Sequence, residues 1–133
     1  MPEWKKISHV SFSVRDADAS ARWLVDLLDM TELERVGGDA WSGVVLEHRP
    51  SGTVLEFQQH ADHDGSRFDH RRTGLDHIGL QVATRAELDA WQRELEQKGV
   101  DHTPVVDREY GAVLTFRHPD GIQFEFFHRQ DHP

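Results

Sequence analysis

The sequence predicts an α+β fold of two tandem βαβββ modules, because two segments occur twice and the apolar residues follow strand and helix spacing in turn. GVVLEHRPSGTVLEF at residues 43–57 is matched by AVLTFRHPDGIQFEF at residues 112–126. Further upstream, ISHVSFSV is matched by LDHIGLQV. Apolar residues alternate within these segments, as in strands, and show helical spacing between them. A repeat of about seventy residues is too long for a solenoid unit and is typical of a duplicated module.

Residues of the same type correspond in the two copies. At a spacing of 69 the matched residues are Pro50 and Pro119, Gly52 and Gly121, Glu56 and Glu125, and Phe57 and Phe126. At a spacing of 68 they are His9 and His77, Val14 and Val82, Trp23 and Trp91, and Leu27 and Leu95. The change of one residue in the spacing fits a small loop difference. Each Pro-x-Gly predicts a turn between two strands, since proline presets φ and glycine adopts a positive φ.

Length and composition limit the class of protein. At 133 residues the chain is most simply one domain spanning 1–133, with module 1 at about 6–60 and module 2 at about 74–129. The absence of cysteine excludes disulfides, thiolate nucleophiles and zinc–thiolate sites. No apolar run has the length of a signal peptide or a membrane span, so we expect a cytoplasmic protein that does not bind membranes.

The charge balance argues against one class of partner. The net charge is −9, with 24 acidic and 15 basic residues. Phosphate contacts need a basic patch, so we expect no binding of nucleic acid, and solubility is the simpler explanation of the acidic excess. The ten histidines do not by themselves indicate a metal, because several lie in predicted loops or near the end of the chain.

The first module is predicted to contain a strand, a helix and three strands. Residues 6–14 alternate, with Val10 and Phe12 on the apolar face. Asp16 or Asp18 caps a helix at about 16–29. Its apolar stripe consists of Trp23, Leu24, Leu27 and Leu28. The strands that follow are at 31–36, about 43–49 and about 53–59, with a glycine turn at 37–39 between the first two.

A polar connector at residues 60–74 precedes the second module. Its mixed charge and lack of periodicity fit a solvated linker, although such a segment can also fold over a site. The second module then repeats the first. Its strands are predicted at 75–83, about 102–107, about 111–117 and about 122–128. Its helix, at about 84–98, begins at Thr84 with the spacing of a capping box and ends before Gly99.

The faces of the predicted strands suggest a site. One face of each strand that carries a repeated His or Glu is apolar enough to pack under a helix, and the other is small or polar. A mixed sheet that buries one face and curls around the other would form a cleft lined by the second set. The side chains expected in that cleft are His9, Glu56, His77 and Glu125.

Each of these four residues has an ordinary explanation when it is taken alone. A histidine on a strand is usually a surface or hydrogen-bonded residue, and a glutamate between apolar neighbours is usually the solvent side of an edge strand. Their occurrence at equivalent places in both modules favours a shared role. Two imidazoles and two carboxylates form a mixed N/O site suited to one divalent ion, whether Ni, Zn, Fe, Mn or Co. Neither a nucleophile elbow nor a glycine-rich phosphate loop is present in the sequence.

The paired βαβββ modules resemble the vicinal oxygen chelate superfamily, the glyoxalase/bleomycin resistance/extradiol dioxygenase group. HPDGIQFEF and the Asp-His-Ile of residues 76–78 carry the resemblance, which covers essentially the whole chain. It implies one divalent metal in a cleft formed by the paired modules and a homodimer, with the site within one chain or shared by two. By position, His9, His77 and Glu125 match the three metal ligands shared by the dioxygenase and thiol-transferase branches. Glu56 matches the fourth ligand of the bacterial glyoxalase I branch.

The four-ligand set favours a glyoxalase-I-like lyase or isomerase. In that reaction the metal holds neighbouring oxygens of a small-molecule substrate, and Glu125 or Glu56 moves a proton through an enediolate. The first alternative is a non-haem Fe(II) dioxygenase of the extradiol type, which uses His9, His77 and Glu125 alone. The second is a bleomycin-resistance-like binding protein without chemistry. The sequence shows no glutathione-binding pattern between Glu56 and His77, so the substrate stays open.

Overall fold

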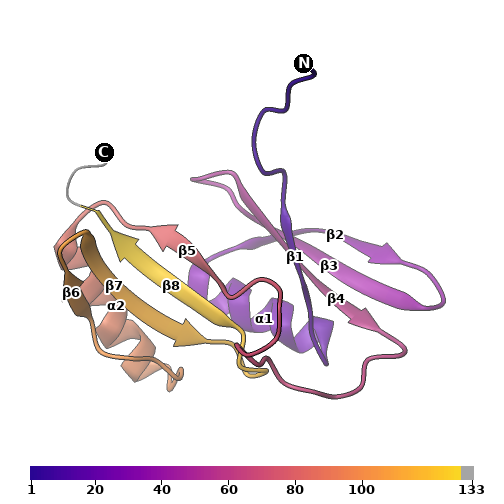
Figure 1. The fold of residues 1–133 in the computed structure, drawn as a ribbon. Coiled ribbons are helices and arrows are strands. Elements are labelled where there is room, and N and C mark those ends of the chain that lie inside the picture. The colour runs from indigo at the N-terminus through magenta and orange to yellow at the C-terminus, as the bar shows by residue number, and fades with distance from the viewer. Residues whose placement is uncertain (130–133) are drawn as a thin grey trace. The chain divides into compact units, whose positions relative to one another are not determined.

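The computed structural model describes residues 1–129 and divides the chain into two compact units. The first is Met1–Ser66, and the second begins at Arg67. Each unit contains one helix and a four-stranded mixed sheet (Figure 1). The predicted α+β class and the tandem βαβββ modules are therefore confirmed, one module in each unit. Among the described residues, no helix is long and apolar enough to cross a membrane.

The order of elements matches the prediction. In the first unit they are β1 (Val10–Ser13), α1 (Ala17–Leu28), β2 (Thr31–Gly37), β3 (Trp41–His48) and β4 (Thr53–His60). In the second they are β5 (His77–Gln81), α2 (Arg85–Gln97), β6 (Val106–Arg108), β7 (Gly111–Arg117) and β8 (Gln123–His128). Several strands are shorter than predicted, among them β5, which covers only His77–Gln81 of the predicted 75–83. The strand β1 begins only at Val10, and β6 follows Pro104, which has no N–H to donate to a ladder, while His102 makes an isolated bridge to Phe116.

Both sheets have the same topology. The strand orders are β1-β4-β3-β2 and β5-β8-β7-β6, so the first strand of each module lies beside the last. These two pairs are parallel, and all other pairs are antiparallel. A parallel pair needs a long crossover, which the helix and the two intervening strands supply. The parallel pairing brings the histidine-bearing end of each module beside its glutamate-bearing strand.

Both helices begin at capped residues close to the predicted positions. The Asp16 carboxylate accepts a hydrogen bond from the Ala19 amide at 2.9 Å, so of the two predicted caps Asp16 is the one used. Thr84 caps α2 by accepting from the Glu87 amide at 3.3 Å. Gly99 follows α2 with a φ of +65°, a conformation that glycine adopts without a steric penalty. The sequence signals for helix ends are confirmed.

Each helix covers one face of its own sheet (Figure 1). Leu24 and Leu27 of α1, and Leu88 and Leu95 of α2, are buried there. Trp91 of α2 stacks on Phe126 with ring centroids 4.3 Å apart. The strands contribute alternate apolar residues to this face: Phe12, Leu55, Phe57, Leu114, Phe116, Phe124 and Phe126. We call the opposite side of each sheet its open face.

The turns between the last two strands differ by one residue. Gly52 and Gly121 have φ values of +72° and +88°, and their amides donate to the carbonyls of His48 and His118, as the predicted turns require. However, Glu56 pairs with Val45 while Glu125 pairs with Thr115. The correspondence therefore shifts by one residue before the turn. Glu56 lies eleven positions after its partner Val45, whereas Glu125 lies ten positions after its partner Thr115. The single spacing predicted across residues 43–57 holds only after the turn.

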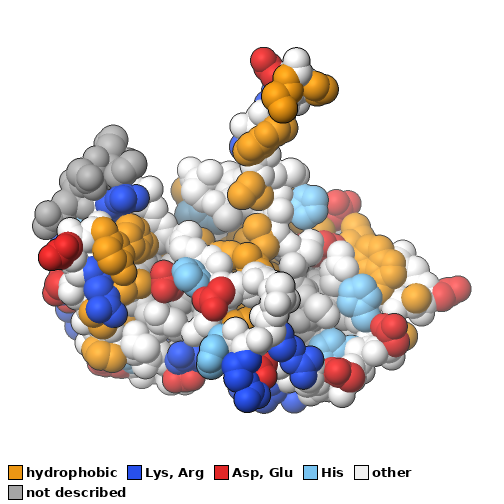
Figure 2. Space-filling model, in the orientation of Figure 1, with side chains coloured by type: hydrophobic (Ala, Val, Ile, Leu, Met, Phe, Trp, Pro, Cys, Tyr) orange, Lys and Arg blue, Asp and Glu red, His pale blue; other side chains and the backbone are white. Residues whose placement is uncertain are grey.

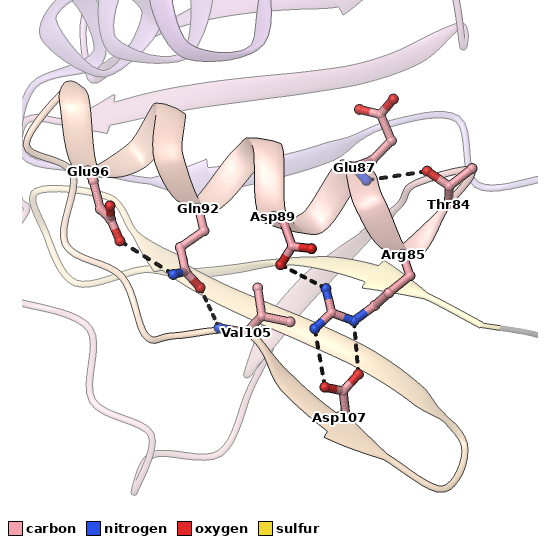
Figure 3. Close-up of polar contacts among 8 residues, drawn as sticks. All are labelled: Thr84, Arg85, Glu87, Asp89, Gln92, Glu96, Val105 and Asp107. Carbon is pink, nitrogen blue, oxygen red and sulfur yellow. Dashed lines mark hydrogen bonds and ion pairs between the residues drawn. The ribbon is translucent and has the colours of Figure 1, made fainter.

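An arginine joins α2 to the edge strand β6 (Figure 3). Arg85 donates to both carboxylate oxygens of Asp107, at 2.9 and 3.2 Å, and to Asp89 at 2.9 Å. The hydrogen bond from Arg85 lowers the pKa of Asp107. Two turns beyond Arg85 on α2, the Gln92 side-chain carbonyl accepts from the Val105 amide at 2.8 Å. These contacts hold a three-residue strand that has only one neighbour in the sheet.

The first unit has a comparable contact with the charges exchanged. There the helix supplies the carboxylate of Asp18, and the edge strand β2 supplies the guanidinium of Arg35. Arg35 also donates to Glu32 at 2.8 Å. Because both charge orders occur in the same fold, the contact depends on opposite charge between helix and edge strand rather than on which residue is the arginine.

We predict that exchanging the charges in the second unit preserves it. Arg85→Asp alone should lower the free energy of unfolding by about 1 kcal/mol, a modest effect because the pair is largely exposed. The double variant Arg85→Asp with Asp107→Arg should recover most of that loss, measured by urea unfolding. Amide exchange of β6 should follow the same order. A double variant less stable than the Arg85→Asp protein would contradict the interpretation.

Candidate functional site

In the second unit, the predicted ligands His77 and Glu125 face each other. His77 begins β5, and Glu125 lies on β8 opposite Gly79 in the parallel register. A Cβ added at Gly79 would have no atom within 4 Å, so this residue leaves open space beside Glu125 on the sheet. The His77 Nε2 and Glu125 Oε2 atoms are 3.4 Å apart. The sheet therefore presents one imidazole nitrogen and one carboxylate oxygen together on its open face.

The preceding residue orients the His77 ring. Asp76 Oδ1 lies 2.6 Å from His77 Nδ1, so the carboxylate accepts a hydrogen bond from that nitrogen. With its proton on Nδ1, a neutral imidazole has a lone pair on Nε2, the atom that faces Glu125. Metal-ligating histidines are commonly held by a carboxylate in this way. Asp76 was not assigned a role from the sequence, although its position beside His77 was the signal for one.

In the first unit, Glu56 is buried on the open side of β4. Its Oε1 atom accepts from the Ser11 hydroxyl at 2.5 Å and from the Gln58 side-chain amide at 2.9 Å. Its Oε2 atom lies close to Gly43, where an added Cβ would come within 2.7 Å. Only 6% of Glu56 is exposed. The carboxylate is thus fixed through one oxygen, and a glycine makes room for the other.

Within residues 1–129, Glu56 has no cationic partner. Its hydrogen-bond donors, Ser11 and Gln58, are both neutral. Burial of an ionised carboxylate is costly unless the charge is paired or binds a metal. A carboxylate with neutral donors on one oxygen is therefore a chemically suitable cation ligand. Sequence reasoning found Glu56 but missed Ser11 and Gln58 as its partners.

His9 directly precedes β1 and is exposed. Its Nδ1 atom is hydrogen-bonded to the hydroxyl of Ser8 at 3.0 Å. Ser8 holds the place that Asp76 has before His77, so both histidines are contacted at Nδ1 by the residue before them. By the alternation of β1, His9 lies on the same open face as Ser11.

Of the predicted site residues, the structure brings His77 and Glu125 into contact. His9 lies just before β1, the parallel neighbour of the strand β4 that carries Glu56. None of the four lies on a helix-packed face, as predicted. In the described part of the chain, no group of three or more His, Asp or Glu side chains is arranged to hold a metal ion. The set of four ligands stays a prediction.

Tandem βαβββ units with a His and a Glu on each open face define a class of paired-module proteins. Residues 6–126 match the Glyoxalase/Bleomycin resistance protein/Dioxygenase superfamily. The chain belongs to that superfamily, as its fold and sequence motifs predicted.

Individual relatives include proteins of several activities. A glyoxylase/bleomycin resistance protein/dioxygenase domain from Frankia sp. EAN1pec is 34% identical, with a TM-score of 0.88, covering 96% of this chain and 100% of that one. The "Putative ring-cleaving dioxygenase MhqA" of Bacillus subtilis (strain 168) is 28% identical over 92% of this chain. This chain spans only 39% of that relative.

Fosfomycin resistance proteins share the fold. FosX from Listeria monocytogenes is 17% identical with a TM-score of 0.75, and the match covers 97% of both chains. A mutant of the same protein was solved with Mn(II) and a dihydroxypropylphosphonic acid, at 19% identity, a TM-score of 0.72 and coverage of 94% and 90%. At this identity the likeness concerns the fold alone.

Proposed function

We propose that the protein is a divalent-metal-dependent enzyme acting on a small molecule that offers two neighbouring oxygens. The metal ligands in this proposal are His9, Glu56, His77 and Glu125. The proposal rests on the two contacts of the His77 ring. Asp76 accepts a hydrogen bond from Nδ1 and orients the ring, and the Glu125 carboxylate lies beside Nε2. The Mn(II) in the FosX structure supports the choice of a divalent ion.

The residues present fit such an ion chemically. Two imidazole nitrogens and two carboxylate oxygens suit Ni, Zn, Fe, Mn or Co, and one ion per site is expected. Asp76 and Ser8 contact the Nδ1 atoms, so both Nε2 atoms are available. Ser11 and Gln58 hold Oε1 of Glu56 and leave Oε2 for ligation.

Our first candidate reaction is that of a glyoxalase-I-like lyase or isomerase. When bound, the ion would act as a Lewis acid towards two neighbouring substrate oxygens and stabilise an enediolate. The chain supplies the base that moves a proton between neighbouring carbons, and Glu125 is suited to this because it is partly exposed and Gly79 leaves it accessible. Glu56, held by two donors, is suited to an anchored ligand and is the second candidate base.

The second candidate is an extradiol-type Fe(II) dioxygenase, which the likeness to the Bacillus subtilis protein favours. Here His9, His77 and Glu125 would be the only protein ligands, leaving positions for a catecholate and dioxygen. The hydrogen bonds from Ser11 and Gln58 would then keep Glu56 out of the coordination sphere. The role of Glu56 therefore separates the two reactions.

The first test is metal content. Protein purified without an affinity tag should carry about one divalent ion per site, measured by inductively coupled plasma mass spectrometry. His77→Ala and Glu125→Ala should each lose most of it, because a ligand is removed. Asp76→Asn should weaken metal binding about 10- to 100-fold, since it changes the partner of Nδ1. Arg85→Ala, remote from the open face, serves as the control.

A wild-type protein that neither retains nor takes up metal would overturn the enzyme proposal. The third candidate, a bleomycin-resistance-like binding protein that holds a small molecule without chemistry, would then be the better description. Normal metal content in both the His77→Ala and Glu125→Ala variants would instead overturn the ligand assignment.

The second test separates the two reactions. If Glu56 is a ligand of a lyase, Glu56→Gln should reduce turnover of α-oxo aldehydes by at least about 100-fold, and catechols should cause no oxygen consumption. An oxygen electrode and an absorbance assay measure both activities on the same metal-loaded samples. Fe(II)-dependent oxygen uptake that survives Glu56→Gln would replace the lyase with a ring-cleaving dioxygenase.

We also propose a cytoplasmic homodimer, without nucleic-acid or membrane partners. Residues 1–9 form no helix or strand, and Trp4 and Ile7 on this arm are 81% and 73% exposed. Figure 2 shows hydrophobic side chains along the N-terminal segment at the top of the view. Exposed apolar side chains of this size are typical of an association surface.

Sedimentation velocity at micromolar concentration should therefore give the mass of two chains. The double variant Trp4→Ser with Ile7→Ser should sediment more slowly, because burial of these side chains stabilises the dimer. Leu33→Ser, also at an exposed apolar position, is the matched control. A wild-type monomer at these concentrations would contradict the proposal.

A further inference from the structure

We infer that the space above Gly79 in the second unit is the substrate's binding position, and that the substrate carries an apolar, planar group that packs on Phe127. This inference rests on the proposed function, and it adds a class of substrate to it. The site consists of His77 and Glu125 at one end and Phe127 and Tyr110 at the other. The first end holds the neighbouring oxygens of the substrate, and the second end holds its planar ring.

The first argument is that Gly79 leaves room on the open face. A Cβ added at Gly79 would have no atom within 4 Å, and its backbone conformation does not require glycine. In the first unit the corresponding residue is Ser11, whose hydroxyl holds Glu56. The second unit therefore lacks the side chain that would fill this space and occupy its glutamate.

The second argument is the apolar row next to Glu125. Phe127 lies two residues beyond Glu125 on β8, so both side chains project from the open face. The ring of Tyr110 stacks on Phe127 with centroids 6.1 Å apart and planes within 13°. Beside Tyr110, a Cβ added at Gly111 would collide with the His128 carbonyl oxygen and come within 3.2 Å of the Phe127 ring, so this glycine lets β7 approach the end of β8 closely.

The first unit shows that the fold does not require this aromatic residue. Gln58 occupies the position of Phe127, and its amide donates to Glu56. The register is the same in both units, because Ser13 pairs with Gln58 and Gln81 pairs with Phe127. An aromatic residue in place of a glutamine, on the face opposite the helix, contributes nothing to the buried core of the unit.

The two arguments concern adjacent positions. Gly79 pairs with Glu125, and the next pair on the same face is Gln81 with Phe127. A ligand whose oxygens lie near His77 and Glu125 would thus extend over Gly79 towards a half-buried ring whose neighbour, Tyr110, is 56% exposed. Aromatic ligands favour such a surface through stacking and through removal of apolar area from water.

A pair of chelating probes tests the inference on the metal-loaded protein. Benzohydroxamic and acetohydroxamic acid offer the same two oxygens and differ in a phenyl against a methyl group. Titration calorimetry should show benzohydroxamate binding about tenfold more tightly than acetohydroxamate. Phe127→Ala, which removes the ring without adding a hydrogen-bond donor beside Glu125, should reduce that ratio to about that of the free metal ion while leaving acetohydroxamate affinity nearly unchanged.

A second variant tests the space itself. Gly79→Val should weaken both hydroxamates at least about tenfold with metal content retained, because the added Cβ meets no protein atom and its methyl groups would take up the binding position. Ser42→Val, at an exposed strand position in the first unit, is the matched small-to-valine control. Circular dichroism and metal analysis of each variant confirm that fold and ion are intact.

The outcomes separate this inference from the proposed function. Metal binding with equal affinity for the two hydroxamates, or a ratio unchanged by Phe127→Ala, would overturn the apolar position and leave the metal proposal standing. Undiminished binding in Gly79→Val would overturn the placement above Gly79. Failure of the wild type to bind metal would overturn the proposed function, and this inference with it.

Discussion

The parallel pairing of the first and last strand of each module is the constraint on which the open faces depend. It fixes Ser11 beside Glu56 and Gly79 beside Glu125, and it brings each histidine to the end of the strand next to its glutamate. A slip of one residue would turn every side chain of that strand to the other face, placing a carboxylate among the phenylalanines under the helix. The large energetic cost of burying that charge without a partner makes the register strongly specified.

The strand register is the same in the two units, but the residues beside the glutamate differ. In the first, Ser11 and Gln58 donate to Glu56, and the carboxylate is nearly inaccessible. In the second, Gly79 and Phe127 stand in those places and donate nothing, so Glu125 is free to meet His77. The two modules have therefore diverged. The first fixes Glu56 by hydrogen bonds, and the second leaves Glu125 partly exposed. The exchanged charges of Asp18–Arg35 and Arg85–Asp107 show similar divergence at a structural contact, where only charge opposition matters.

Much of the fold could be predicted because its signals are local. Alternation places Phe124 and Phe126 under the helix and Glu125 opposite, and caps such as Thr84 mark where helices begin. The one-residue shift before the turn was missed, because aligning Pro50 with Pro119 hides a difference in turn length that only strand pairing reveals. The partners Ser11 and Gln58 were missed for a related reason. Ser11 and Glu56 are 45 residues apart, and no periodicity within either strand reports which residue of the other lies opposite.

The different surroundings of the two glutamates bear directly on the chemistry. A proton acceptor must change its charge during turnover, which is easier for a carboxylate that is partly exposed and makes no hydrogen bond to a fixed neutral donor. Glu125 meets that description. Glu56 does not, because only 6% of it is exposed and its Oε1 atom accepts hydrogen bonds from two neutral donors, Ser11 and Gln58. Within the proposed function, the environment of Glu56 therefore suits a constant negative charge that helps to balance a cation, and proton transfer is assigned to Glu125.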